Sequence, residues 1–280
     1  MHLSMVLLAL ILACSLRLGW VGPIGGYSQR WRCALSLFLI PSLLLVVTVI
    51  AIVIMGPQGQ MFWHQEGWLS YGFAISFVGI AIGLGLHLAW QGWLAVRQAR
   101  QYPQLAIADH SGRLLNTPVV FSAQVGFWRP ELVISQGMLD YLDESHLEAV
   151  LTHEQGHRHY HDTFWFFWLG WLRRLTFWLP QTEALWQELL LLREIRADQW
   201  AAQQVDKLIL AESLIQVVKT PLLTSEEICA GFSCAAPSSR LEQRIDALLD
   251  ESYYTASPAL MPWMRLLTTL LPLAVVPFHH

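Results

Sequence analysis

The chain has 280 residues, of which 54% are hydrophobic and 14% are charged, and its formal net charge is −4. This composition excludes an ordinary soluble protein and predicts an integral membrane protein. A slightly acidic chain without a basic stripe also argues against nucleic-acid binding.

Three apolar segments lie in the first 96 residues. Ala34–Met55 and Trp68–Val96 are each long enough to cross the roughly 30 Å hydrocarbon core of a bilayer as a helix. Residues 3–16 form a shorter segment, and its end at Leu12-Ala13-Cys14 resembles a lipoprotein cleavage site. No Lys or Arg precedes that segment, so we expect an uncleaved helix. Residues 1–96 are therefore predicted to hold three transmembrane helices.

Acidic side chains mark the part of the chain that faces water. Of the 21 acidic residues, all but Glu66 lie between Asp109 and Glu251, so we expect residues 97–258 to form a polar domain. Pro258–Phe278 is apolar again. We expect a last transmembrane helix in residues 259–280.

Arginines indicate which side of the membrane the polar domain occupies. Arg17, Arg30 and Arg32 fall between the first and second predicted spans, and Arg97 and Arg100 follow the third. The loop between the second and third spans has no Lys or Arg. By the positive-inside rule, we expect a multi-pass protein of the cell membrane with its N-terminus outside and its polar domain in the cytoplasm.

The polar domain begins with short apolar runs between turn-forming residues. Gln104–Ala108, Pro118–Phe121 and Leu132–Ile134 predict a small antiparallel sheet. Asp143-Glu144-Ser145-His146 is typical of a helix start, and we expect a helix over Leu147–His159. The predicted fold class is a mainly α-helical integral membrane protein with a small α+β cytoplasmic domain.

The pattern His153-Glu154-Gln155-Gly156-His157 supplies the chemistry of a catalytic zinc site. On a helix, His153 and His157 point from one face and can bind a single Zn²⁺. Glu154 is placed to take a proton from zinc-bound water and to pass it to a leaving amine. Catalytic zinc needs a third protein ligand and an open fourth position, and we assign the third ligand to Glu194. Asp198, one turn further along, could accept the free ring N–H of a ligand histidine.

An aromatic apolar segment separates the two parts of this pattern. Residues that bind one ion lie on one side of the bilayer, so the chain between them crosses it an even number of times. Two crossings need about 40 apolar residues, and thirty-six residues separate His157 from Glu194. We therefore expect an interfacial or re-entrant helical hairpin near 163–200, with Arg173 and Arg174 at the lipid headgroups. A buried hairpin without lipid contact is the alternative.

Other residues near the motif are candidates for supporting roles. His146, Tyr160 and Arg240 could stabilise the oxyanion of a tetrahedral intermediate. Asp162 is expected to be a structural hydrogen-bond partner. The strand near Val119–Ser122 could bind an extended peptide through its edge, although a core strand is the simpler interpretation.

The histidines allow interpretations from other functional classes. His153, His157, His159 and His161 could form one box of a membrane di-iron oxygenase, but such enzymes need further boxes, and the remaining histidines are isolated or end the chain. A fourth protein ligand would also close the water position on zinc, so we expect His161 to stay off the metal. A non-catalytic membrane scaffold is the third interpretation, which the intact Glu154 disfavours.

The stretch from Thr117 to Gln203, with its flanking spans, resembles the BlaR/MecR-type integral membrane zinc metallopeptidases, the antirepressor family of gluzincins. The matching features are Pro130–Ile134, the His153–His157 motif with Asp162 five residues on, the aromatic segment ending in Pro180, and Arg193–Asp198. HtpX-type and CAAX-prenyl proteases share the His-Glu-x-x-His and the later Glu-x-x-x-Asp.

This resemblance implies a gluzincin metalloprotease domain with one Zn²⁺ on His153, His157 and Glu194, with Glu154 as base and Asp198 in support. It implies a protein or peptide substrate, such as a repressor or another cytosolic or membrane-proximal regulatory protein; an HtpX-like quality-control protease is the alternative. Receptors of this family carry a penicillin-binding sensor after the last span, which this sequence lacks. We therefore expect no antibiotic sensing and a signal from a sensor partner protein.

Overall fold

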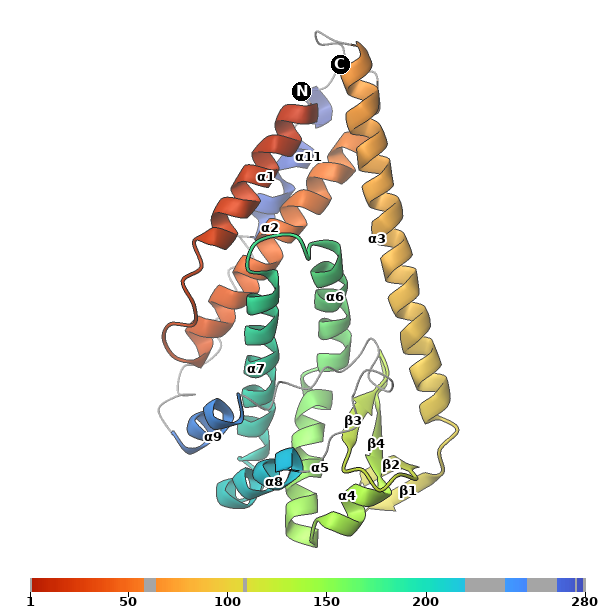
Figure 1. Ribbon diagram of the computed structural model, residues 1–280, viewed down its shortest axis with the longest axis vertical. Coiled ribbons are helices and arrows are strands. Elements are labelled where there is room, and N and C mark those ends of the chain that lie inside the picture. Colours follow the sequence, from red (N-terminus) through yellow and green to blue (C-terminus); the bar gives the residue numbers. More distant parts are fainter. Residues whose placement is uncertain are drawn as a thin grey trace. The chain divides into compact units, whose positions relative to one another are not determined.

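The computed structural model describes residues 2–57, 64–107, 110–219, 240–250, 266–274 and 276–278 (Figure 1). The chain divides into two compact units that alternate along the sequence. The first contains Met1–Leu86, Leu172–Leu189 and Ala256–His280, and the second contains His87–Trp171 and Leu190–Thr255. Three helices begin in one unit and end in the other: α3 (His64–Ala99), α6 (Asp162–Leu175) and α7 (Thr182–Ala201).

Two apolar helices pack together in the first unit. α1 (His2–Leu18) and α2 (Tyr27–Met55) contain the predicted spans at 3–16 and 34–55. Ala9 and Ala13 of α1 are buried in a cluster with Leu44 and Leu45 of α2. Their small side chains let the two helix backbones approach closely.

Arg17, which we expected in a loop, lies in the last turn of α1 and has no exposed surface. Its guanidinium donates to the Phe38 carbonyl at 3.1 Å, to Ser42 Oγ at 3.2 Å and to Thr182 Oγ1 at 3.2 Å. A buried guanidinium needs such acceptors, because an unsatisfied charge inside a protein is costly. Arg17 therefore ties α1 to α2 and to the first residue of α7.

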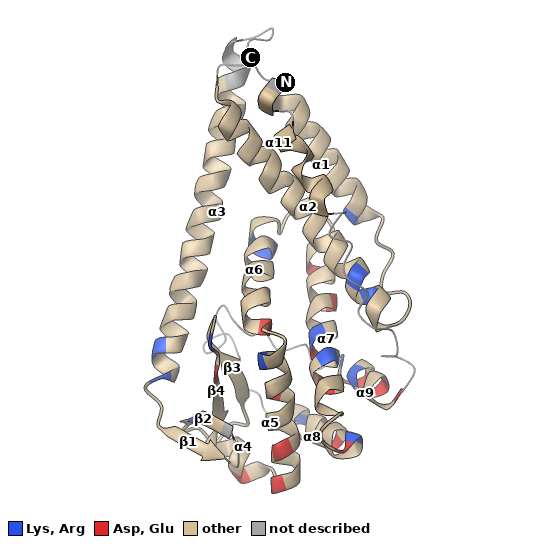
Figure 2. Cartoon of the chain, turned by 180° about the vertical axis from the view of Figure 1, so that it is seen from behind, with Lys and Arg blue, Asp and Glu red and all other residues tan. Residues whose placement is uncertain are grey.

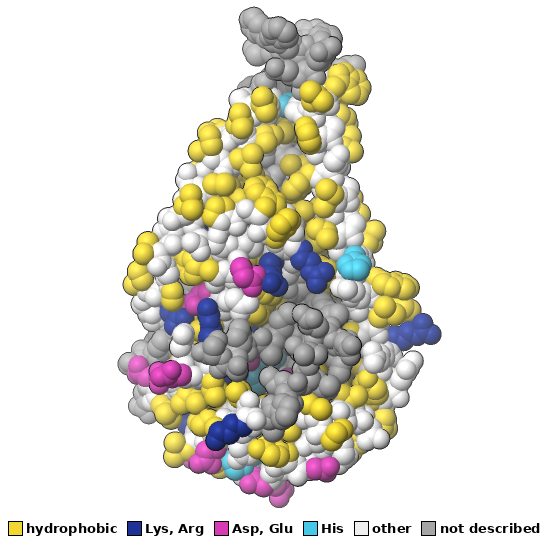
Figure 3. Space-filling view, viewed as in Figure 1, with side chains coloured by type: hydrophobic (Ala, Val, Ile, Leu, Met, Phe, Trp, Pro, Cys, Tyr) yellow, Lys and Arg dark blue, Asp and Glu magenta, His cyan; other side chains and the backbone are white. Residues whose placement is uncertain are grey.

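Two of the described helices have the length and apolar composition of membrane spans, namely α2 and residues Trp68–Ala99 of α3. Only 11% of the most apolar window of α3 is buried, so its hydrophobic side chains face outward. A helix in a soluble core buries its apolar face instead. Figure 3 shows hydrophobic side chains gathered over α1 and α2 as well. These features favour a membrane location.

The predicted last span over 259–280 falls partly outside the described residues. The part that the structure describes forms short turns: η2 (Thr268–Leu270), α11 (Leu271–Ala274) and η3 (Val276–Phe278). A transmembrane helix at this end of the chain stays a prediction.

The second unit contains a four-stranded sheet in the order β1-β2-β4-β3. Its strands are β1 (Gln104–Ile107), β2 (His110–Leu115), β3 (Ser122–Val125) and β4 (Glu131–Ser135). The prediction of a purely antiparallel sheet was wrong, because β2 pairs with β4 in parallel. Gly112, one of the residues expected to form a turn between the predicted strands, lies inside β2, where a Cβ atom would come within 3.2 Å of the Leu132 carbonyl oxygen. The predicted strand at 118–121 begins instead at Ser122.

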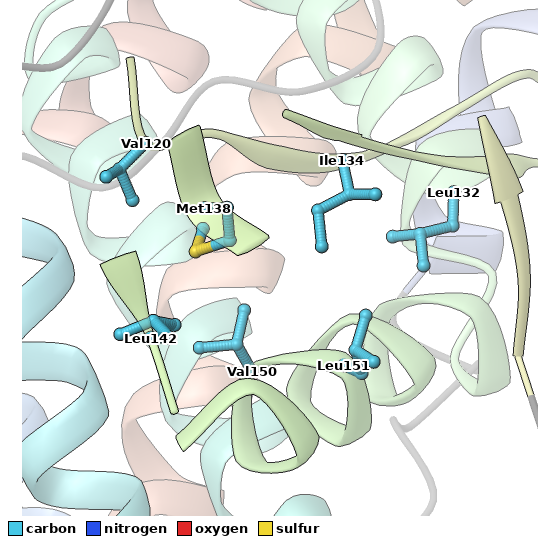
Figure 4. Packing of buried hydrophobic residues seen from close by; sticks show 7 residues of the cluster. All are labelled: Val120, Leu132, Ile134, Met138, Leu142, Val150 and Leu151. Atoms are coloured by element: carbon cyan, nitrogen blue, oxygen red, sulfur yellow. The ribbon is translucent and has the colours of Figure 1, made fainter. Parts of the chain in front are cut away.

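A hydrophobic core joins this sheet to two helices, α4 (Gln136–Tyr141) and α5 (Glu144–His159). Figure 4 shows side chains from β4, α4 and α5 pointing toward one another. Ser135 caps α4 by accepting a hydrogen bond from the Met138 amide, and Asp143 caps α5 by accepting from the His146 amide. The caps and the core fix the axis of α5, which carries the histidine motif.

The aromatic segment folds into two helices, and its interfacial or re-entrant position stays a prediction. α6 and α7 are joined by residues 176–181, with Gln181 at a φ of 57°. At about 1.5 Å per residue, the 14 residues of α6 are too short to cross a bilayer. α8 (Lys207–Lys219) and α9 (Leu241–Leu249) complete the second unit's described helices.

Candidate metal centre

Two histidines from α5 and a carboxylate from α7 meet in the second unit. His153 Nε2 lies 3.1 Å from His157 Nε2. Glu194 Oε2 lies 3.4 Å from the first of these atoms and 3.6 Å from the second. Among the residues that the structure describes, these three are the only group of His, Cys, Asp or Glu side chains gathered closely enough to hold a metal ion.

Gly156 lets α5 and α7 approach closely enough for this meeting. A Cβ atom at Gly156 would lie 3.1 Å from Ala197 Cα and 3.2 Å from the Ala197 carbonyl oxygen, which is closer than side chains normally pack. Ala197 is itself fully buried. Small residues at both positions therefore place Glu194, three residues before Ala197, beside the histidines.

The far ring nitrogen of each histidine faces a carboxylate. His153 Nδ1 lies 2.8 Å from Asp198 Oδ1, and His157 Nδ1 lies 2.8 Å from Asp162 Oδ2. His161, at a φ of 54°, follows α5 and turns the chain back so that Asp162 reaches the ring. Such contacts fix the orientation of each ring and leave Nε2 available to a metal.

An arginine faces each of the three carboxylates around the site. Arg193 donates to Glu194 Oε1 at 2.7 Å, Arg244 donates to both oxygens of Asp198 at 2.8 Å, and Arg196 donates to Asp162. Burial alone would raise the pKa of Glu194 and of Asp198. The positive charges of Arg193 beside the first and Arg244 beside the second outweigh burial, so both pKa values are lowered and both carboxylates stay ionised.

The same carboxylates raise the pKa of both histidines. Burial lowers the pKa of His153, but the charge of Asp198 outweighs it and the pKa is raised. Burial also lowers the pKa of His157, but the charges of Glu194 and Asp162 outweigh burial and raise this pKa to about 10. The site therefore attracts positive charge, and a divalent metal ion can replace the imidazolium protons.

Glu154 connects this site to the sheet. It lies next to His153 on α5 and is 7% exposed. Ser122, the first residue of β3, donates its hydroxyl to Glu154 Oε1 at 2.9 Å. A buried carboxylate next to a metal-ligand candidate in the chain is a candidate for proton transfer to and from a metal-bound water.

Two of the three candidates for oxyanion stabilisation, His146 and Tyr160, make contacts away from the metal position. His146 is in the first turn of α5, where its ring lies 2.7 Å from Asp143 and 3.3 Å from Glu212. The Tyr160 ring lies under the Arg196 guanidinium, at 4.2 Å from the ring centroid. Arg240 is the residue that precedes α9.

Sequence reasoning missed Arg244, which is the α9 residue that faces the site. Besides its two bonds to Asp198, Arg244 Nη1 lies 3.6 Å from Glu194 Oε2. The only signal for it in the sequence is a second arginine one helical turn after Arg240. Spacing alone does not decide which of the two turns inward.

The remaining histidines of the cluster lie outside the site. His159 is exposed and stacks on Trp200 with ring centroids 5.5 Å apart, and His161 is exposed. A second group of metal ligands is absent from the described part of the chain. The di-iron interpretation therefore gains no support.

The match to a family model covers this whole arrangement. Residues 116–257 match the model of peptidase family M48, and they include the three metal-ligand candidates, Glu154 and Arg244. The match spans just over half of the 280 residues. The chain belongs to peptidase family M48. A comparison with curated proteins gave no match.

Membership of family M48 indicates a metallopeptidase, and peptidases of this family are generally zinc-dependent. The donor atoms fit that metal: two imidazole nitrogens and one carboxylate oxygen are a common ligand set of catalytic zinc, which keeps a fourth position open. The M48 match does not single out the antirepressor type that the sequence resembles.

Proposed function

We propose that this M48 peptidase is a membrane-embedded zinc endopeptidase that cleaves proteins at the cytoplasmic surface of the cell membrane. The observation that supports it is the meeting of His153, His157 and Glu194, whose ligand atoms lie within 4.8 Å of one another. Zinc bound there would polarise a peptide carbonyl and lower the pKa of a water molecule.

The protein's own side chains then orient the reactants and move the proton. Asp198 and Asp162 hold the two histidine rings with Nε2 toward the metal position. Glu154 takes a proton from water and delivers it to the leaving nitrogen of the cleaved peptide. The hydrogen bond from Ser122 keeps the Glu154 carboxylate in place between these two transfers.

The edge of β3 is a suitable place for the peptide backbone. In the described sheet, β3 pairs with β4 on one side and is the last strand on the other. An extended peptide can add to such an edge through main-chain hydrogen bonds. Because β3 starts at Ser122, a peptide paired with it passes close to Glu154.

The membrane location and the substrate rest on further observations. α2 and α3 have the length and apolar composition of membrane spans. The distribution of arginines favours a cytoplasmic active site with the N-terminus outside. The resemblance to antirepressor peptidases favours a regulatory protein, such as a repressor, as the substrate, with activation through a sensor partner. Cleavage of misfolded membrane proteins is the outcome that would favour the HtpX-type role instead.

A pair of matched variants tests the proposal. Purified protein in nanodiscs should contain close to one zinc per chain and should degrade labelled casein. Glu154→Gln should keep the zinc and lose proteolysis, because it removes the base and leaves the ligands intact. Glu148→Gln is the control, since Glu148 is an exposed acid on the same helix.

The outcomes separate the competing interpretations. Proteolysis by Glu154→Gln at the rate of the unmodified protein would refute the assigned base. Zinc binding without cleavage of casein or of a peptide library would favour a scaffold. Iron at two per chain would favour the oxygenase.

A further inference from the structure

The exposed tryptophans of the second unit come from three elements that pack together. Those with at least 44% of their surface exposed are Trp90, Trp93, Trp128, Trp165 and Trp168. The first two lie on α3, the third in the turn between β3 and β4, and the last two on α6. We call them the tryptophan surface.

Phe127 in the β3–β4 turn joins these elements. It packs against a buried cluster formed by Leu88 of α3 and Phe167 of α6, as does Val96 of α3. The Phe127 ring centroid lies 5.0 Å from that of Phe167 and 6.3 Å from that of Trp168, both on α6. The turn is thus held against the end of α3 and the side of α6.

Trp128 projects from this turn and is 77% exposed. Gly126 allows the bend, because its φ is 138° and a Cβ atom there would come within 3.0 Å of Pro130 Cα. On its inner side the Trp128 ring packs on Phe164, at 4.9 Å between centroids. A well-anchored turn therefore presents a large aromatic side chain outward, where water would be an unfavourable neighbour.

The depth of the turn follows from the length of α3. A helix rises about 1.5 Å per residue, so a span that starts at Trp68 leaves the roughly 30 Å hydrocarbon core near residue 87. Trp90 and Trp93 follow within two turns, in the headgroup layer where tryptophan is enriched. Because Phe127 packs against the cluster that contains Leu88 of α3, the β3–β4 turn lies near the level of Leu88.

Basic side chains accompany the tryptophans. The Arg97 guanidinium lies 5.3 Å from the Trp93 ring centroid, and Arg129 in the turn is exposed. Figure 2 shows basic residues at the end of α3 that leads into β1. Indole rings beside guanidinium groups match the lipid headgroup zone, where the ring meets the acyl boundary and the cation meets phosphate.

We propose that the β3–β4 turn is a membrane anchor, with Trp128 and Arg129 lying in the headgroup layer of the same leaflet that α3 leaves. The proposal rests on the proposed insertion of α3 into the membrane and names the lipid surface as the partner of the tryptophan surface. It adds a contact through the sheet to those made by the helices.

The anchor sets the distance between the site and the lipid. Trp128 is the sixth residue after Ser122, and an extended chain covers at most about 3.6 Å per residue, so Ser122 lies within about 22 Å of the headgroups. Ser122 contacts Glu154. The peptide bonds that reach this site are therefore those in segments close to the membrane surface.

Spin labels at single cysteines in nanodiscs test the anchor without any need for activity or zinc. In a background with the native cysteines replaced by serine, the test labels are Trp128→Cys and Trp165→Cys. Leu86→Cys reports the hydrocarbon, since Leu86 lies in the apolar part of α3 and is 67% exposed. Tyr141→Cys reports water, since Tyr141 is 48% exposed at the end of α4.

Collision rates with oxygen and with a water-soluble nickel complex give the depth of each label. We expect the labels at 128 and 165 to collide with nickel several-fold less often than the label at 141, and to lie between the labels at 141 and 86 in depth. A label at 128 that collides with nickel as often as the label at 141 would overturn the anchor. Hydrocarbon depth at 86 in the same experiment keeps that result separate from a failure of α3 to insert, and loss of proteolysis bears on neither.

Discussion

Asp198 is expected to set the zinc affinity although it does not touch the metal position. It has no exposed surface, lies 2.8 Å from His153 Nδ1 and accepts two hydrogen bonds of 2.8 Å from Arg244. Asp198→Asn keeps the shape of the side chain and removes its charge. The ring of His153 then loses the partner that orients it and increases its basicity.

The expected loss of zinc affinity follows from what His153 and Arg244 each lose. Removing the partner behind a metal-bound histidine typically weakens metal binding about 10- to 100-fold, which corresponds to about 1.4–2.7 kcal/mol. Arg244 also loses its main acceptor, and its Nη1 already lies 3.6 Å from Glu194 Oε2. A guanidinium shifted toward that oxygen competes with zinc, so both effects act in the same direction.

Competition with a chromophoric chelator in detergent solution measures this affinity directly. Asp206→Asn is the matched control, because Asp206 is exposed and its cap on α8 needs only an oxygen acceptor. Circular dichroism checks that the variant is folded, since breaking a buried ion pair can cost about 3–5 kcal/mol. A folded Asp198→Asn protein that binds zinc as tightly as the unmodified protein would show that the aspartate does not support the metal ligand.

Three more predictions concern the same site. The pKa of His157 is raised to about 10 and that of His153 is also raised, so zinc binding near pH 8, where ordinary histidines are already neutral, should release at least about one proton per ion. Calorimetry in buffers of different ionisation enthalpy counts the protons, and no release would contradict the raised pKa values. Gly156→Val should push α7 away from α5 and abolish zinc binding. Gly72→Val should leave zinc binding unchanged, because a Cβ atom at Gly72 has no neighbour within 4 Å. Equal zinc contents in the two variants would refute the close approach of α5 and α7. Ser122→Ala should lower kcat by about 10- to 100-fold, the worth of a hydrogen bond to a charged group, with zinc content unchanged; an unaltered kcat would mean that Glu154 needs no support from β3.

The pairing of candidate site residues on each helix could be predicted from the sequence because it depends on helical periodicity. His153 and His157 are four residues apart, and so are Glu194 and Asp198, so each pair shares a helix face whatever the tertiary structure. The gap between the two pairs was also sufficient to predict a hairpin. What the sequence does not contain is the distance between α5 and α7, which depends on the contact of Gly156 with Ala197.

Long-range pairing was harder to predict than local structure. The parallel pairing of β2 with β4 includes Gly112, which carries the sequence signal of a turn but lies within the strand against the Leu132 carbonyl. Arg244 was missed for a similar reason. Its partner Asp198 is 46 residues earlier in the chain, and helical periodicity carries no information about contacts across that distance.

The charges around the site are balanced by pairs of carboxylates and guanidinium groups. Glu194, Asp198 and Asp162 are paired with Arg193, Arg244 and Arg196, so three buried or nearly buried carboxylates are balanced by three guanidinium groups. The carboxylates still raise the pKa of both histidines because each has an oxygen close to an imidazole nitrogen. Asp198 lies 2.8 Å from His153 Nδ1, Asp162 lies 2.8 Å from His157 Nδ1, and Glu194 lies 3.4 Å from His153 Nε2. Protons on His153 and His157 and a divalent ion between them carry similar charge. Exchange of one for the other therefore leaves the charge balance of the surrounding ion pairs nearly unchanged.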